Sequence, residues 1–283
     1  EVKMNDSVWA KKIISAQNSD GSWGFFHTMC SISDSKKITT EQALRRLKNL
    51  GFTKEDKVIS KTLSYIQKCL EGTVAIPDRR EKFRDWDVFF SFIFSAWLKL
   101  FDAQTKQSEK ICLKLGSVIE KAFGKKVFNI DIYLSEFKKE FGVKPHNARN
   151  FDFVSFYQIV LLKDILTQKT EQLMLEYILN KDNGIYYIYN KKLSQLPAEF
   201  KSLQTVRYMD AVELIAEYRY SSDCLVFVSD WLKHHVEEDG FWDLGAKAKD
   251  NISFPISDSW RSPNSRKKDC TARVTRLLRM IQK

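Results

Sequence analysis

The sequence predicts an all-α fold, and three of its features support that prediction. Apolar residues recur with helical periodicity along most of the 283-residue chain, which is 43% hydrophobic. The chain contains only 10 glycines and 5 prolines, so residues that interrupt helices are few. The single segment whose pattern is typical of extended chain is 185–189 (IYYIY). We therefore expect long helices joined by turns around a sizeable core.

Periodicity places the helices, and capping residues bound several of them. A sequence typical of a capping box begins at Thr53, and Gly51, Gly72, Gly142 and Gly184 stand where helices should end. The expected helices span 2–17, 40–50, 54–70, 87–101, 106–123, 130–141, 152–166, 169–179, 205–218, 223–236 and 269–281.

An Arg-x-x-Asp pair occurs four times at regular intervals. The successive aspartates are 65, 58 and 59 residues apart, and each begins an apolar helix. A proline precedes each pair, and most pairs also follow a polar-faced helix that ends near a glycine. The repeating unit is therefore a helical hairpin with an outer and an inner helix. The four pairs are Arg84/Asp87, Arg149/Asp152, Arg207/Asp210 and Arg266/Asp269.

The repeated hairpins are expected to stack and close into a ring, because a single hairpin cannot bury its own apolar face. A looser copy at 2–17 and 40–50 brings the number to at least five, and helices within 104–143 supply a sixth outer member or an insertion. The last helix, of inner type, stays apolar to its end, whereas an open stack would need a polar cap. We expect a single domain over residues 1–283.

The turn segments carry a motif that resembles a known family. Residues 13–24 (IISAQNSDGSWG) are similar to the Q-x-x-D-G-x-W repeat of terpenoid cyclases, including the squalene-hopene cyclase group. Protein prenyltransferase β subunits have a related repeat. Residues 236–242 (VEEDGFW) and 180–186 (NKDNGIY) are further copies, and residues 43–66 resemble the helix-turn-helix between repeats. The resemblance implies an α/α toroid of about five to six hairpins. In it, the glycine permits the turn and the Trp or Tyr packs against the preceding helix end.

The acid motif of this family is matched in part. Class II cyclases protonate an alkene through Asp-x-Asp-Asp, and the nearest segment here is 85–88 (DWDV), which lacks the final acid. The resemblance implies Asp87 as the catalytic acid. Asp85 would be the neighbour that stabilises its anion by hydrogen bonding.

The zinc motif of the prenyltransferases is not matched. That motif is Asp-x-Cys with a distant His, whereas the chain has adjacent Asp-Cys pairs at 223–224 and 269–270. The five cysteines are scattered and form no disulfide framework. We expect no metal and no cofactor.

The Arg-x-x-Asp pairs predict a ligand site. The inner helices of a ring run parallel, so their N-termini should gather at one mouth, where arginines and helix dipoles attract anions or carboxylates. His146 lies in the loop that leads to Arg149, and His27 is a similar candidate. The alternative is that each Asp caps a helix and each Arg holds a loop. The candidate ligand-binding residues are Arg84, Arg149, Asp152, Arg207, Asp210, Arg266, Asp269 and His146.

Three functions remain open. The first is a cyclase-like toroid, of uncertain enzymatic status, that binds a small anionic or peptide-like ligand at the mouth. The second is a terpenoid cyclase-type enzyme that uses Asp87 as acid. The third is an interaction scaffold whose lumen is filled by side chains.

Charge and hydropathy limit the classes of partner that the chain is expected to bind. Lys and Arg (46) exceed Asp and Glu (36), but the arginines at 273, 276 and 279 recur as on one solvated helix face, so nucleic acid is not the expected partner. The longest apolar run, 88–101, is too short to span a bilayer. No signal peptide opens the chain, although a removed one would leave no trace. We expect a cytoplasmic protein, and the sequence does not predict its oligomeric state.

Overall fold

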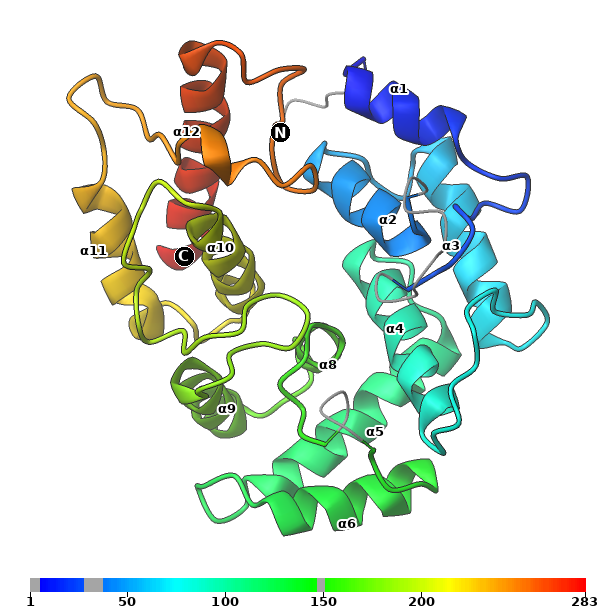
Figure 1. The fold of residues 1–283 in the computed structure, drawn as a ribbon. Helices are drawn as coiled ribbons and strands as arrows, with labels where there is room; N and C mark the ends of the chain where they lie inside the picture. Colours follow the sequence, from blue (N-terminus) through cyan, green and yellow to red (C-terminus); the bar gives the residue numbers. More distant parts are fainter. Residues whose placement is uncertain (1–5, 28–37, 147–150) are drawn as a thin grey trace.

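The computed structural model describes residues 6–27, 38–146 and 151–283. Within these ranges the structure is helical and contains no β-strand, which confirms the all-α prediction. Figure 1 shows the helices following one another around the molecule in chain order. The helices are α1 (Val8–Ser15), α2 (Thr40–Asn49), α3 (Lys57–Leu70), α4 (Trp86–Leu100), α5 (Lys106–Ala122), α6 (Ile130–Phe141), α8 (Phe156–Leu162), α9 (Gln168–Asn180), α10 (Leu203–Ala216), η1 (Asp223–Leu225), α11 (Val226–His234), η2 (Ala246–Ala248) and α12 (Pro263–Ile281).

Most helix boundaries differ from the expected ones by a few residues, and the three largest shifts in a helix start each have a local reason. Helix α12 begins at Pro263 rather than 269, because a proline at the first helical position needs no backbone partner. Helix α8 begins at Phe156 rather than 152, where the Ser155 hydroxyl caps it by accepting the Gln158 N–H. Helix α1 is likewise shorter than expected, and Ser7 caps it.

The expected extended segment at 185–189 is wrong. The chain there makes a tight turn in which the Ile185 and Tyr189 backbones bond to each other, with Tyr187 at a positive φ of 74°. The run of aromatic and β-branched residues is instead explained by burial, since Ile185 and Tyr189 pack into the core.

Two of the repeat turns form the same contacts. In each, the tryptophan indole N–H donates to the carbonyl oxygen ten residues earlier, near the end of the preceding helix: Trp23 to Ile13 at 2.8 Å and Trp242 to Leu232 at 2.6 Å. The tryptophan therefore joins the turn to the helix that precedes it, as expected from the motif.

The same two tryptophans also join each turn to the helix that follows it. The backbone N–H of Trp23 donates to the Thr40 hydroxyl of α2 (3.0 Å), and that of Trp242 to the Thr271 hydroxyl of α12 (2.9 Å). One side chain and one backbone amide thus connect the helix before the turn to the helix after it at both places. At these two turns the repeat in the sequence is therefore also a repeat of hydrogen bonds.

Helix contacts place α4 at the centre of the first half of the molecule. It contacts α3, α5 and α8, while α8 also contacts α10, and α10 contacts α12. Helix α4 is buried on most sides, as its almost continuously apolar sequence requires. Helices α5 and α6, from the region expected to hold an insertion or extra pair, pack against each other.

The first and last parts of the chain are joined by hydrogen bonds. The buried guanidinium of Arg46 on α2 donates to the carbonyl oxygens of Ile252 and Pro255. Near the start of α1, the Trp9 indole donates to the Ser257 carbonyl (3.2 Å). Because burial dominates, the pKa of Arg46 is lowered to about 10, although nearby aspartates oppose the shift.

None of the helices in the described ranges has the length and apolar character needed to cross a membrane.

The repeat glycines give a test of the turn geometry. Gly184 and Gly240 both have positive φ (59° and 79°), but an added Cβ at Gly184 would lie 2.2 Å from the Tyr189 carbonyl oxygen, whereas Gly240 has open space. We expect Gly240→Ala to lower the free energy of unfolding by about 1 kcal/mol, which is the cost of the left-handed conformation. Gly184→Ala should cost about 3 kcal/mol or more because backbone must also move.

Urea denaturation of the two variants measures this difference. Equal losses of stability in both variants would contradict the close approach at Gly184.

Candidate functional site

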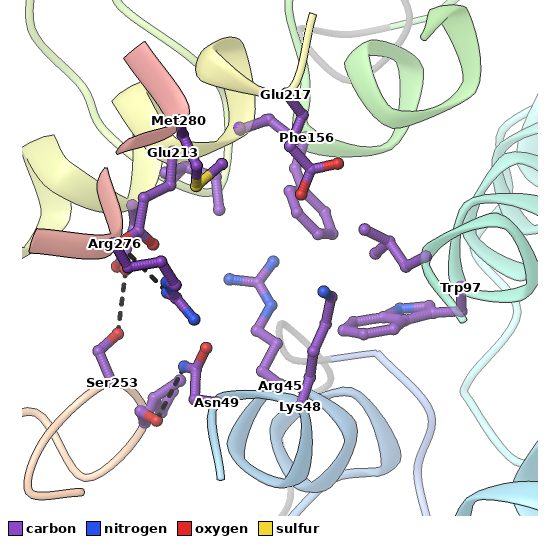
Figure 2. Close-up of a pocket in the computed structure, with 15 residues that line it drawn as sticks. Arg45, Lys48, Asn49, Trp97, Phe156, Glu213, Glu217, Ser253, Arg276 and Met280 are labelled. Atoms are coloured by element: carbon purple, nitrogen blue, oxygen red, sulfur yellow. Dashed lines mark hydrogen bonds and ion pairs between the residues drawn. The ribbon is translucent and has the colours of Figure 1, made fainter. Parts of the chain in front are cut away.

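The central cavity lies among α2, α4, α8, α10 and α12 and has a volume of about 270 Å³. Figure 2 shows side chains from these helices converging on it. Except at α8, the lining residues that belong to helices come from the middle or C-terminal part of each helix, and the others come from loops. The lining residues are Arg45, Lys48, Asn49, Trp97, Leu100, Phe156, Ile188, Asp210, Glu213, Leu214, Glu217, Ile252, Ser253, Arg276 and Met280.

A second cavity of about 380 Å³ adjoins the central cavity. The two share Lys48, Leu100, Leu214, Glu217 and Met280. The combined space is large enough for a ligand of several residues or rings.

Two cations from α2 extend into the central cavity. Figure 2 shows the Arg45 and Lys48 side chains rising side by side from α2. The Arg45 guanidinium lies 4.4 Å from the centre of the Phe156 ring, a cation–π contact. Neither side chain forms an ion pair with any part of the chain that the structure describes, and the buried Nε of Arg45 has no hydrogen-bond partner there.

The carboxylates of the cavity, in contrast, have cationic partners. Glu213 accepts hydrogen bonds from Arg273 and lies 3.3 Å from Arg276, while Glu217 lies 3.0 Å from Lys163. Burial alone would raise the pKa of Glu213, but the two arginines outweigh it and lower the pKa. Asp210, which also binds Arg273, differs because burial dominates and raises its pKa.

A buried carboxylate, Glu41, lies behind the cavity wall in a set of polar contacts. Its Oε1 accepts the Tyr157 hydroxyl (2.6 Å) and the Trp97 indole N–H (3.0 Å), and its Oε2 lies 2.7 Å from His27 Nδ1. The other ring nitrogen of His27 lies 2.7 Å from the Tyr187 hydroxyl. We call these five side chains the Glu41 cluster.

The Glu41 cluster keeps its carboxylate ionised. Burial would raise the pKa of Glu41, but the hydrogen bond and charge of His27 outweigh it, with smaller contributions from Arg45 and Tyr157. The net result is a pKa of about 2. Trp97 lines the cavity and binds Glu41, and Arg45 lines the cavity and lowers the Glu41 pKa. The cluster therefore positions the cavity wall and sets its electrostatics.

The two proposed catalytic acids lie apart from this cavity. Asp87 is exposed and lies 2.6 Å from Arg80, and neither Asp85 nor Asp87 is among the residues that line the central cavity. Asp85 is buried and accepts the backbone N–H of His146 at 2.8 Å. The structure thus brings together two predicted residues, Asp85 and His146, and Arg84 and His146 line a separate cavity.

The other predicted ligand residues have diverse neighbours. Asp152 pairs with Lys181, and Arg207 is exposed on α10. Among the predicted ligand residues, Asp210 lines the central cavity. Arg149 lies outside the described residues.

The last Arg-x-x-Asp pair holds loops. Arg266 binds both oxygens of Asp243 at 2.7 Å, and Asp269 accepts the backbone N–H groups of Ile256 and Ser257. Here the described side chains follow the alternative in which each acid and arginine holds its own part of the chain.

Arg45, Lys48 and Glu41 were not identified from the sequence. Their signal is weak but present: Glu41 and Arg45 are one turn apart on the helix, next to the buried positions Ala43 and Leu44. A charged residue beside the apolar face of a short helix must find a partner or a cavity. The sequence shows the need for that partner but not its identity.

Across the described ranges, the structure contains no group of three or more His, Cys, Asp or Glu side chains placed to hold a metal ion. Comparison with protein-family models, with curated proteins and with solved structures finds no match to this chain.

The Glu41 cluster predicts a large effect of one substitution. Glu41→Gln should lower the free energy of unfolding by about 3 kcal/mol, since His27, Tyr157 and Trp97 lose a buried anionic acceptor. Glu238→Gln, an exposed change of the same kind, is the control and should stay within about 0.5 kcal/mol.

The pH dependence of urea denaturation gives a second measurement. The folded pKa of Glu41, about 2, is below its ordinary 4.5, so the stabilisation is present above about pH 4.5 and is lost as the pH falls toward 2. The decrease in stability below pH 4.5 should be smaller in Glu41→Gln. An unchanged acid dependence would show that Glu41 is not held as an anion.

Proposed function

We propose that the chain is a cyclase-like α/α toroid that binds a peptide-like ligand with a free carboxylate in its central cavity. Enzymatic activity is not required by this proposal. The ring arrangement is supported by the chain of helix contacts from α4 through α8 and α10 to α12, and by the Arg46 bonds that join α2 to residues 252–255. The two equivalent repeat turns support the same arrangement.

The observation that carries the binding proposal is the state of Arg45. Its guanidinium projects into the cavity over Phe156 and forms no ion pair or hydrogen bond among the described residues. Donors that face a cavity without a protein partner can bind a ligand oxygen. A guanidinium also matches the two oxygens of a carboxylate. Lys48, one turn further along α2, adds a second positive charge.

The remaining cavity surface favours a peptide-like ligand over a simple anion. Glu217 faces the space from the opposite side and offers acceptors to N–H or ammonium groups (Figure 2). Trp97, Phe156, Ile188 and Met280 provide apolar contacts between the charged groups. A peptide has these features in alternation: a carboxylate, N–H donors and apolar side chains.

The two alternative functions have less support. A cyclase acid would have to face the cavity that holds the alkene, whereas Asp87 is exposed beside Arg80. A scaffold with a filled lumen would leave no space among the inner helices, whereas the central cavity and its neighbour occupy about 270 and 380 Å³.

Calorimetric titration with the tripeptide Ala-Phe-Ala, and with its C-terminal amide, tests the proposal. The free acid should bind more tightly than the amide. Arg45→Gln should weaken binding of the acid about tenfold or more, since a charge-assisted hydrogen bond contributes about 1.5–3 kcal/mol. Binding of the amide should change little.

Arg279→Gln is the matched control, because it removes the same charge from an exposed position on α12. Its affinity for the tripeptide should equal that of the unmodified chain. Equal affinity for acid and amide, or equal weakening by both substitutions, would contradict a carboxylate held by Arg45.

A further inference from the structure

A separate cavity of about 670 Å³ lies between the segment before α4 and the end of α6. Its lining combines cationic and apolar side chains and shares none with the central cavity. The lining residues are Lys82, Phe83, Arg84, Lys138, Gly142, Val143, Lys144, Pro145 and His146. We call this space the basic cleft.

The charged side chains that line the basic cleft are positive. Four lining side chains are basic (Lys82, Arg84, Lys138 and Lys144), and none of the described residues that line the cleft is acidic. All four are exposed, and none forms an ion pair within the described ranges. By contrast, Lys121 of α5 lies 2.6 Å from Glu136 of α6. Unopposed like charges around one concavity repel one another and favour an anionic occupant.

The walls of the basic cleft are held in place by contacts on its buried side. The Phe83 ring stacks on the His146 ring, with centroids 4.3 Å apart. The carboxylate of Asp85, buried beneath, accepts the backbone N–H of His146 at 2.8 Å. Gly142 ends α6 in the left-handed conformation, which turns the chain toward His146. The two segments are therefore joined, and the cleft is a feature of the fold rather than of loose side chains.

We propose that the basic cleft is a docking site for an acidic peptide segment of a partner protein, with an apolar side chain seated against Phe83 and Val143. Charge complementarity favours acidic residues on both sides of that apolar side chain in the peptide. The apolar part of the lining favours an apolar side chain of the peptide as an anchor, because a compact anion would leave this apolar surface exposed. Lysines on flexible stems suit carboxylates that vary in position, whereas a fixed phosphate is usually bound by converging donors.

Fluorescence anisotropy with labelled peptides tests this inference. The probes are Glu-Glu-Leu-Glu-Glu, the same peptide with Gly in place of Leu, and Lys-Lys-Leu-Lys-Lys. Each is amidated at its C-terminus, so that it lacks the terminal carboxylate proposed to bind Arg45. The first should bind saturably and weaken as salt is added, the Gly peptide should bind about tenfold more weakly, and the basic peptide should not bind. Loss of the Leu preference would overturn the anchor and with it the proposal.

The double variant Arg84→Gln/Lys144→Gln should weaken the acidic peptide about tenfold. Lys110→Gln/Lys169→Gln, which removes the same charge from exposed helical positions outside the cleft, should have little effect. Equal weakening by the two double variants would mean non-specific attraction and would overturn the site. The salt and anchor comparisons on the unmodified chain do not depend on how either variant folds.

Arg45→Gln should leave binding of the acidic peptide unchanged, which separates this site from the central cavity. Competing outcomes are tested with single-stranded RNA and with phosphatidylcholine vesicles that contain phosphatidic acid. If either binds more tightly than the acidic peptide and loses affinity in Arg84→Gln/Lys144→Gln, the cleft is a nucleic-acid or lipid site and the peptide assignment is wrong.

Discussion

The interaction on which much of the structure depends is the burial of one ionised carboxylate, Glu41. An unpaired buried charge would be costly, so the chain must bring donors to it from several places. His27 comes from the segment after the first turn, Trp97 from α4 and Tyr157 from α8, and Tyr187 holds the far side of His27. Segments that are distant along the sequence are therefore held together around α2.

The Glu41 cluster also connects structure to the proposed function. Trp97 and Arg45 each have one side toward Glu41 and another toward the central cavity. The charge of Arg45 helps to lower the pKa of Glu41, but the two side chains form no direct ion pair among the described contacts. The Arg45 guanidinium is therefore left to contact a ligand in the cavity. The acids across the cavity differ, because each has its own cationic partner.

Local sequence was sufficient for the presence of the helices and for two of the three predicted repeat turns. Helical periodicity depends on near neighbours, and the glycine turn with its tryptophan forms contacts within about ten residues, as Trp23 and Trp242 show. The extended segment at 185–189 was predicted wrongly, because a run of aromatic residues has the same composition in a buried turn as in a strand. Of the predicted ligand residues, Asp210 lines the central cavity, and Arg84 and His146 line the basic cleft.

The sequence by itself determined that this is a helical protein, because the positions of apolar, glycine and capping residues directly constrain the backbone. Only the tertiary structure decided which charged side chains have a hydrogen-bond or ion-pair partner. Asp87, Asp152 and Asp269 share a place in the repeat, yet they contact an arginine, a lysine and the backbone amides of a loop, respectively. Arg45 and Lys48, which the repeat does not mark, reach the cavity instead. The partner of a charged side chain is set by packing between distant helices, and no local pattern encodes it.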